Sequence, residues 1–246
     1  MSEPLSTHSD HWKIDFLNES ENIREILKDK LIETHHIGST AITGILAKPK
    51  IDIACVVSDL DAPRVLEQHG YVFKGEFNIP FRYFFSKKGE VSANLHVMLP
   101  GNHELQNFLN FRDYLNSDEE ARKIYSDFKQ TIEANLNSQK ANSMFNDYTM
   151  AKNKIVAKLI KKSGFKGICM RFVAHYLEQE YEKTQCVKNE LQINPNDVRV
   201  VLYQGANIIG YAQGRGNSIT FIKSEAFLDD FRNYFQSYLN WKNVLK

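Results

Sequence analysis

The chain has 246 residues, of which 42% are hydrophobic and 25% are charged, and its formal net charge at pH 7 is +1. This composition is typical of a globular protein with a buried core, and the length allows one large domain or two small ones. A charge this close to zero gives no strong field to attract nucleic acid or an anionic membrane, so we expect neither as a partner. No run approaches the roughly 18 apolar residues of a membrane span.

The N-terminal stretch MSEPLSTHSDHWK lacks the basic and then apolar pattern of a secretory signal. The three cysteines are Cys55, Cys169 and Cys186, an odd number at wide spacing. This pattern is typical neither of a disulfide framework nor of a zinc site. We therefore expect a cytoplasmic protein with reduced thiols.

Up to about residue 98, β-branched residues and alternating hydrophobicity predict strands separated by turns. The expected strands are LIETHHI, KIDIACVV, YVFKG, FRYFFS and VSANLHVML. Short helices are expected over SENIREILKDK and DAPRVLEQHG, and one or two helical turns over STAITGILAK. Pro49 closes that last segment because a residue before proline avoids the helical region.

Helical spacing of apolar residues then continues to about residue 162. It predicts helices over NHELQNFLNFRDYL, SDEEARKIYSDFKQTIEANL and DYTMAKNKIVAKLIKK. Ser117 and Glu120 fit a capping box at the start of the second helix. Strands followed by helices predict an α+β domain over residues 1–162, in which helices pack against a sheet.

KKSGFKG is the expected linker to a small C-terminal α+β domain of unknown role, residues 167–246. We expect a helix over GICMRFVAHYLEQEYEK, a hairpin that turns at Gln204–Asn207, a strand over SITFIK and a closing helix capped by Ser224. The alternative is that these strands extend the sheet of the first domain.

The pair Gly38-Ser39 follows a predicted strand, and Asp52 lies on the return strand. N–H groups at a helix start carry partial positive charge, and a glycine lets a phosphate approach them closely. Asp52 would lie beside this turn, where a carboxylate can hold Mg²⁺ against bound phosphates. The spacing alone favours a plainer interpretation, in which Ser39 caps the turn and Asp52 pairs with Lys48 or Lys50.

The stretch HIGSTAITGILAKPKIDI resembles the signature of the GrpB family, a bacterial module. The resemblance covers residues 1–162 and also includes Trp12, FRYFF, LHV, FRDYL and YTMAK in the same order. The family is assigned to the nucleotidyltransferase superfamily, which has the fold of DNA polymerase β-like enzymes. The resemblance therefore implies a nucleotidyltransferase-like mixed sheet flanked by helices.

The resemblance also implies roles for individual residues. Asp52 would hold Mg²⁺ as a catalytic residue, and His96 would help to deprotonate an acceptor. The remaining candidates are, for phosphate, Gly38, Ser39, Thr40, Lys48 and Arg82, and, for other ligand contacts, His36, Arg112 and Lys152. His35 is expected on the opposite face from His36. Arg112 has the plainer alternative of a local pair with Asp113, and the other lysines up to Lys166 are expected on a solvated helix face.

The chain departs from the superfamily pattern at two acidic positions. Ala54 stands at the second position of the return strand, and His96 stands where a third carboxylate is usual. Imidazole is a poor ligand for Mg²⁺. Substrate phosphates, or a remote acid such as Glu33 or Asp113, would have to complete the metal shell. Thr43 replaces a proline that the family often has.

The leading hypothesis is a metal-dependent nucleotidyltransferase that binds a nucleoside triphosphate and transfers a nucleotidyl group to a small-molecule acceptor. The alternative is a non-catalytic module that binds a nucleotide or another phosphate ligand, or assists folding, and Ala54 favours it. The residues identify neither the acceptor nor the preferred base.

Overall fold

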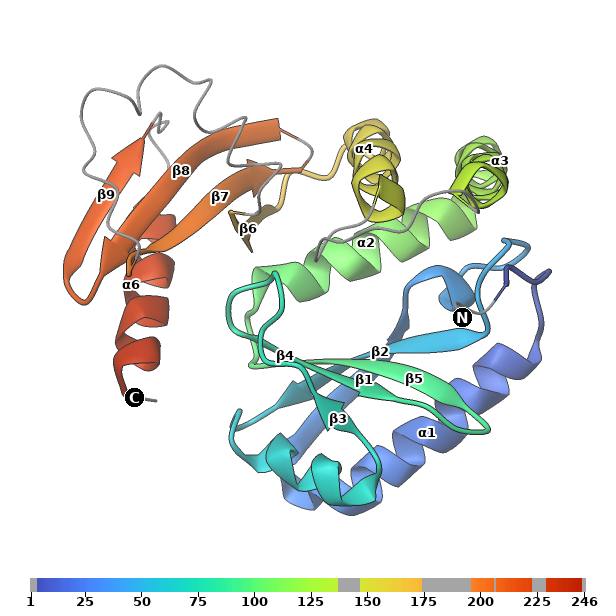
Figure 1. Cartoon of the computed structure of the whole chain (residues 1–246), viewed down its shortest axis with the longest axis horizontal. Coiled ribbons are helices and arrows are strands. Elements are labelled where there is room, and N and C mark those ends of the chain that lie inside the picture. Colours follow the sequence, from blue (N-terminus) through green and yellow to red (C-terminus); the bar gives the residue numbers. More distant parts are fainter. Residues whose placement is uncertain (1–3, 137–146, 174–195, 206, 223–228, 245–246) are drawn as a thin grey trace. The chain divides into compact units, whose positions relative to one another are not determined.

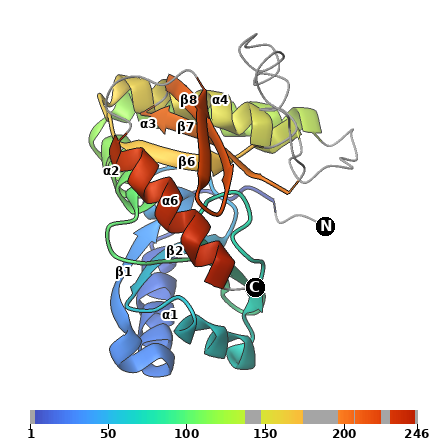
Figure 2. The same cartoon turned by 90° about the vertical axis from the view of Figure 1, so that its left-hand side faces the viewer.

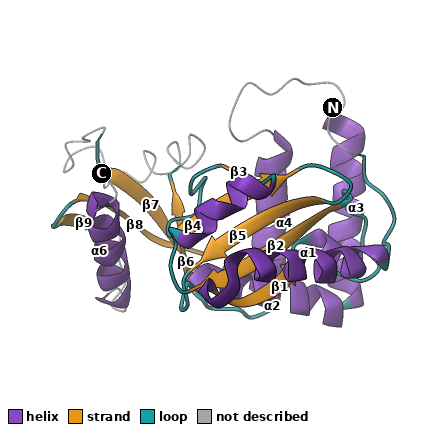
Figure 3. Ribbon diagram, turned by 90° about the horizontal axis from the view of Figure 1, so that it is seen from below, coloured by secondary structure: helices purple, strands orange, loops and turns teal. Residues whose placement is uncertain are grey.

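The computed structural model describes residues 4–136, 147–173, 196–205, 207–222 and 229–244. Its strands form two sheets (Figure 3). The chain divides into two compact units: Met1–Phe77 with Arg82–Phe165, and Asn78–Phe81 with Lys166–Lys246. Among the described residues, no helix is long and apolar enough to cross a membrane.

The first unit contains a mixed five-stranded sheet in the order β1-β2-β5-β4-β3. Only β2 and β5 pair in parallel among the described strands of this sheet, and the other neighbours are antiparallel. The strands are β1 (Leu31–Ile37), β2 (Lys50–Val57), β3 (Val72–Phe73), β4 (Arg82–Lys87) and β5 (Ser92–Met98). This arrangement confirms the predicted mixed sheet, and β1 and β2 have the predicted bounds.

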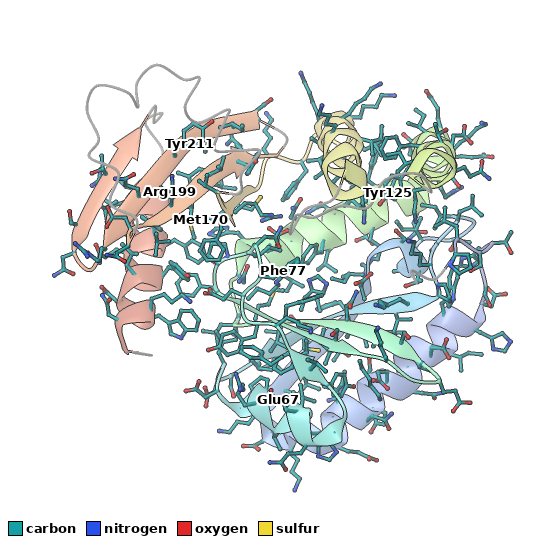
Figure 4. All side chains as sticks on the ribbon, in the orientation of Figure 1. Glu67, Phe77, Tyr125, Met170, Arg199 and Tyr211 are labelled. Atoms are coloured by element: carbon teal, nitrogen blue, oxygen red, sulfur yellow. The ribbon has the colours of Figure 1, made fainter. Side chains whose placement is uncertain are left out.

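Helices cover both faces of this sheet (Figure 1). The helix α1 (His11–Leu27) lies on one face and α2 (His103–Ser117) on the other. The helices α3 (Glu119–Leu136) and α4 (Asp147–Lys162) extend the α2 layer through a cluster that includes Leu115, Tyr125 and Leu159. The ring of Tyr125, labelled in Figure 4, meets that of Phe111 on α2 at 5.5 Å. The helices therefore hold the sheet from both sides, as predicted.

Three helical segments differ from the predictions. α1 begins at His11 rather than near Ser20, because buried Trp12 lies three turns before buried Ile23 and lengthens the apolar stripe. The last residues of that predicted helix form the 3₁₀ segment η1 (Lys28–Lys30), and two further 3₁₀ segments, η2 (Ser39–Ala41) and η3 (Ala62–His69), replace the other two predicted helical segments.

The capping box predicted at the start of α3 is wrong. Asp118 caps this helix, because its Oδ1 accepts a hydrogen bond from the Ala121 N–H at 2.8 Å. The Ser117 hydroxyl instead donates to the Tyr114 carbonyl at the end of α2. A carboxylate at this place also interacts favourably with the helix dipole.

The second unit is an antiparallel meander in the order β6-β7-β8-β9, crossed on one face by α6 (Figure 2). Its elements are β6 (Ile168–Phe172), β7 (Val198–Gln204), β8 (Asn207–Arg215), β9 (Ser218–Ile222) and α6 (Asp229–Val244). The predicted hairpin is confirmed by the pairing of Gln204 with Asn207. The helix predicted from Gly167 is wrong over β6, because these residues pair with β7; its remainder and Ser224 lie outside the described residues.

Residues 78–81 of the loop between β3 and β4 belong to the second unit. The Phe172 N–H donates to the Asn78 carbonyl at 3.0 Å. Phe81 is 8% exposed, and its ring lies 4.8 Å from that of Tyr238 and 5.6 Å from that of Trp241. Two separately folding domains with bounds 1–162 and 167–246 stay a prediction, and the loop residues are a part of the second unit that this prediction missed.

Candidate functional site

Polar side chains gather on the sheet face that α2 covers. The register pairs Asp52 on β2 with Asn94 on β5, and Ala54 with His96. Because side chains alternate along a strand, these four residues share one face. The His96 ring meets that of Phe108 on α2 at 5.0 Å, which identifies the face.

The Asp52 carboxylate lies directly beside the Gly38-Ser39 turn. Its Oδ1 accepts a hydrogen bond from Asn94 Nδ2 at 2.9 Å, and His96 Nε2 approaches the same oxygen at 3.6 Å. Its Oδ2 packs so closely on Gly38 that a Cβ at position 38 would collide with it. The side chain is 27% exposed. The plainer interpretation, in which a lysine pairs with Asp52, is replaced by these contacts.

The charge of Asp52 is stabilised by its neighbours. Burial alone would raise the pKa of this carboxyl, but His96, the Asn94 amide and the positive charge of Lys152 outweigh it and lower the pKa below its ordinary value. Asp52 is therefore ionised at neutral pH. Lys152, which is half-buried on α4, thus acts on the same site.

The turn itself is a single 3₁₀ turn. Its hydrogen bonds run from the Ala41 N–H to the Gly38 carbonyl and from the Ile42 N–H to the Ser39 carbonyl. The N–H groups of Ser39 and Thr40 precede the first of these bonds, as expected at the start of a helical segment. The buried Thr40 hydroxyl forms hydrogen bonds with His36 Nε2 at 3.0 Å and with the Lys50 carbonyl at 3.5 Å. These bonds attach the turn to β1 and β2.

Two residues on α2 hold the turn from both sides. Arg112 Nη1 donates to the His36 carbonyl at 3.0 Å, just before the turn. Asn116 Nδ2 donates to the Ala41 carbonyl at 3.1 Å, and its Oδ1 accepts from the Thr43 N–H at 3.0 Å. Sequence reasoning missed Asn116; the signal was its place one helical turn after Arg112, on the same helix face.

The two neighbouring histidines lie on the faces opposite to those predicted. His36 pairs with Ile53 and stacks on Phe16 of α1 at 4.8 Å, so it lies on the α1 face. His35 pairs with Ala54, on the Asp52 face. Burial lowers the pKa of His36 to about 4, and the charge of Arg112 adds to this effect while Asp52 opposes it. His36 is therefore a neutral hydrogen-bond partner of Thr40.

Arg82 is 3% exposed and lies against His96 inside the unit. Its Nη1 is 3.0 Å from His96 Nδ1, its Nη2 donates to the Glu76 carbonyl at 2.9 Å, and its guanidinium lies 4.8 Å from the Phe84 ring centre. Arg82 therefore has contacts with His96, the Glu76 carbonyl and Phe84 inside the protein. Its contact with a phosphate stays a prediction. Buried Glu104 of α2 also acts electrostatically on His96, and sequence reasoning missed it.

The other candidates lie around this centre without adding a carboxylate to it. Glu33 is half-exposed and pairs with His35 Nε2 at 3.2 Å. Asp113 pairs with Arg112 Nε at 2.7 Å, as the plainer interpretation of this pair predicted. Lys48 is half-buried just before Pro49, and its role toward a phosphate stays a prediction.

The residues at Asp52 do not fit a two-ion magnesium centre. One oxygen of the carboxylate already accepts from Asn94, and the adjacent β2 position on this face is Ala54. No group of three His, Cys, Asp or Glu side chains suited to a metal occurs within the part of the chain that the structure describes. Mg²⁺ prefers several oxygen ligands in octahedral geometry, and Asp52 alone supplies one open oxygen.

A cavity of about 540 Å³ lies elsewhere in the first unit. It is lined by residues of α1, η1, η3 and β4, including Lys28 and Lys87. Beneath it, Lys87 Nζ and the Tyr71 hydroxyl both donate to buried Glu19. Lys87 therefore neutralises the charge of Glu19 beside this cavity.

The fold and this site define a class of α+β protein, in which a mixed sheet presents a Gly-Ser turn to one strand carboxylate. The family profile described as "GrpB protein" matches residues 4–162, so the chain belongs to the GrpB family, as the resemblance implied.

Individual relatives agree with this assignment. The chain is 30% identical to the UPF0157 protein BH1888 of Halalkalibacterium halodurans, over 65% of this chain and 81% of the relative. It is similar to the crystal structure of the conserved protein GrpB from Enterococcus faecalis, with 25% identity and a TM-score of 0.56, over 65% of this chain and 98% of that one. A terminal uridylyl transferase from Trypanosoma brucei, with bound dUTP, has 12% identity, a TM-score of 0.41 and coverage of 64% and 56%. A likeness of that size says nothing about the chemistry of this chain.

Proposed function

We propose that the first unit binds a nucleotide or a related phosphate-bearing small molecule at the Gly38-Ser39 turn, without metal-dependent transfer. The observation that carries this proposal is the set of partners around Asp52. Asp52 lies beside the turn and accepts from Asn94, while Ala54 and His96 stand at the two positions where the resemblance implies further acids for a transferase. The alternative weighed from the sequence thus becomes the preferred function.

The phosphate would be held by main-chain donors and by nearby positive charge. The N–H groups of Ser39 and Thr40 start the 3₁₀ turn and would be the main-chain donors to a phosphate oxygen. Lys152 contributes positive charge at Asp52. Arg112 uses its Nε and Nη1 in bonds to Asp113 and to the His36 carbonyl and is a quarter exposed, so further N–H groups of its guanidinium can face a ligand.

The second candidate is the metal-dependent nucleotidyl transfer that the sequence favoured, with Mg²⁺ on Asp52 and a small-molecule acceptor. One observation supports it: an ionised carboxylate lies beside the turn. The donor set around this carboxylate lacks the other acids, which is why the binding module ranks first.

Thermal shift with ATP and with inorganic triphosphate, each with and without Mg²⁺, tests the proposal. A ligand at about 100 times its Kd stabilises the fold by about 2.7 kcal/mol, a readily measured rise in Tm. We expect this rise without Mg²⁺ and no pyrophosphate release. Arg112→Gln should weaken it, while Arg24→Gln, which changes a half-exposed arginine of α1 that pairs with Glu21, is the control.

Two results would contradict the binding module. Stabilisation that requires Mg²⁺, is abolished by Asp52→Ala and is accompanied by pyrophosphate release would establish the transferase instead. The absence of any Tm rise with either triphosphate would exclude a phosphate site at this turn.

A further inference from the structure

We propose that Arg82 is a positioning residue that fixes the tautomer of His96, and that this makes Asp52 a hydrogen-bond acceptor for a ligand hydroxyl or amino group. The part that concerns the ligand rests on the proposed function; the part that concerns the tautomer does not. The proposal follows from which atoms can donate and which can accept.

The first step concerns His96 Nδ1. A guanidinium has N–H donors and no acceptor, and Arg82 Nη1 lies 3.0 Å from this nitrogen. Nδ1 must therefore accept, which places the proton of the neutral ring on Nε2. A proton on Nδ1, in the other tautomer or in the imidazolium, would set two donors against each other.

The second step concerns the rigidity of the pair. Arg82 is held at its other end by the Glu76 carbonyl and lies over the Phe84 ring. The His96 ring meets Phe84 and Phe108 edge to face at 5.2 and 5.0 Å. Packing on two sides keeps the ring from turning, so Nε2 keeps its direction.

The third step concerns Asp52. The Asn94 amide donates to Oδ1 at 2.9 Å, and His96 Nε2, which carries the proton, lies 3.6 Å from the same oxygen. The protein thus directs one hydrogen bond and one further N–H group toward Oδ1, while Oδ2 lies beside Gly38. A carboxylate oxygen accepts only, so the ligand group that suits Oδ2 is an O–H or an N–H near a phosphate. Nucleotides carry both groups.

This assignment also changes the role predicted for His96. A general base must offer a lone pair to the proton that it removes. The lone pair of His96 is on Nδ1 and is directed at Arg82, so His96 does not fit as the base of a transfer reaction. It acts instead through Asp52.

The tautomer is measured by ¹⁵N NMR of the histidine rings in the full chain at pH 7, with H96Q to assign the signal. We expect wild-type His96 to show one neutral form, with the proton on Nε2 and a bare Nδ1. R82M should populate forms with a proton on Nδ1. R82K should preserve the wild-type form, because lysine is also a donor without an acceptor.

R64M is the matched control, because Arg64 also lies over a phenylalanine ring, that of Phe73 at 4.1 Å. It should leave the His96 signal unchanged. A proton on Nδ1 in the wild-type chain, or a signal that is the same in wild type and R82M, would overturn the proposal. If R82M does not fold, R82Q takes its place, because the glutamine amide also offers an oxygen that can accept from a protonated Nδ1.

The ligand part is tested by comparing ATP with 2′,3′-dideoxyATP and inorganic triphosphate by calorimetry. We expect ATP to bind about tenfold more tightly than inorganic triphosphate, and D52A to remove this preference. Equal binding of both in the wild-type chain would overturn this part. The dideoxy compound shows whether the ribose hydroxyls or the base amino group is the donor. If no triphosphate binds at all, the proposed function fails while the tautomer result stands.

Discussion

Gly38 lets the strand carboxylate and the turn come together. It has φ +72°, a region that L side chains rarely adopt, and its missing Cβ leaves the space that Asp52 Oδ2 fills. Gly38→Ala should therefore lower the free energy of unfolding by about 2–5 kcal/mol, through backbone strain and displacement of Asp52. Urea unfolding at pH 7 measures the loss.

Gly44 provides the matched control for this substitution. Its φ is +75°, but a Cβ there would meet nothing within 4 Å. Gly44→Ala should cost only the strain, about 1–2 kcal/mol. Equal losses for the two alanine variants would show that the close approach of Asp52 contributes nothing.

The lowered pKa of His36 predicts that the free energy of unfolding depends on pH. Its pKa falls from 6.5 to about 4 on folding, so between these values the unfolded chain binds the extra proton. Stability from His36 is therefore present above pH 6.5 and is lost as the pH falls toward 4. The slope in this window is at most about 1.4 kcal/mol per pH unit.

Urea unfolding of wild type and His36→Gln from pH 7 to pH 4 measures this contribution as a difference. The difference between the two chains should shrink as the pH falls. The lowered pKa of Asp52 acts below its ordinary value of 3.8, outside this range. Parallel stability curves for the two chains across the range would contradict the burial argument.

For single residues, the sequence predicted that Asp52 lies beside Gly38, but it did not predict the hydrogen-bond partners of Asp52. The spacing from Gly38 to Asp52 is set by a strand, a turn and a return strand, so their closeness followed from local pattern. The partners of Asp52 depend on the parallel pairing of β2 with β5, which are far apart in the chain. No local pattern reports that register, which is why Asn94 was missed and why the contacts of Arg82 with His96 and the Glu76 carbonyl were not predicted.

The helix α2 acts on the turn as one element, through Arg112 and Asn116 on one face. Asn116→Ala would remove two exposed hydrogen bonds, to Ala41 and Thr43, and should cost about 1 kcal/mol of stability. It should also weaken triphosphate binding, because the turn loses the contact that fixes its end. Chemical unfolding and calorimetry measure the two effects.

Asn110→Ala is the control on the same helix, because Asn110 Nδ2 bonds only to the Gln106 carbonyl among the described contacts. It should leave binding unchanged. Asn116→Asp, which keeps the acceptor for the Thr43 N–H and loses the donor, should fall between wild type and alanine. Unchanged binding in Asn116→Ala would mean that α2 does not set the turn.

Among the elements, β1 and β2 were predicted with their observed bounds, β1 from the alternation in LIETHHI and β2 from the β-branched and small residues of KIDIACVV. The pattern failed at β6, where Ile168–Phe172 is also compatible with a helix. Tertiary pairing with β7 decided that segment. The boundary of α1 was missed because Trp12 lies three turns before Ile23, the next buried apolar residue of its stripe.

At the scale of the whole chain, the two units have one tryptophan each. Trp12 is buried in α1 of the first unit, and Trp241 lies on α6 of the second. Their fluorescence can therefore follow the two units separately, after Trp12→Phe or Trp241→Phe leaves a single reporter. This tests the predicted division of the chain into separate domains, which composition and a linker suggested and which no local pattern could establish.

Substitution of Phe81 tests whether the two tryptophans report separate unfolding transitions. Although it precedes β4, it packs on Tyr234, Tyr238 and Trp241 of the second unit. Phe81→Ala would open a cavity in that cluster, at a cost of about 3–5 kcal/mol. We expect the unfolding midpoint that Trp241 reports to fall strongly, and the midpoint that Trp12 reports to fall less.

Phe77→Ala is the matched control, because Phe77 has the same φ of +60° as Phe81 but is 47% exposed. It belongs to the first unit and should move the Trp241 midpoint little. If Phe81→Ala shifts both reporters equally, the chain unfolds as one cooperative body, and the domain prediction is wrong. If it shifts neither, residues 78–81 do not contribute to the stability of the second unit, because a buried aromatic side chain cannot be removed from a cooperative core without lowering its midpoint.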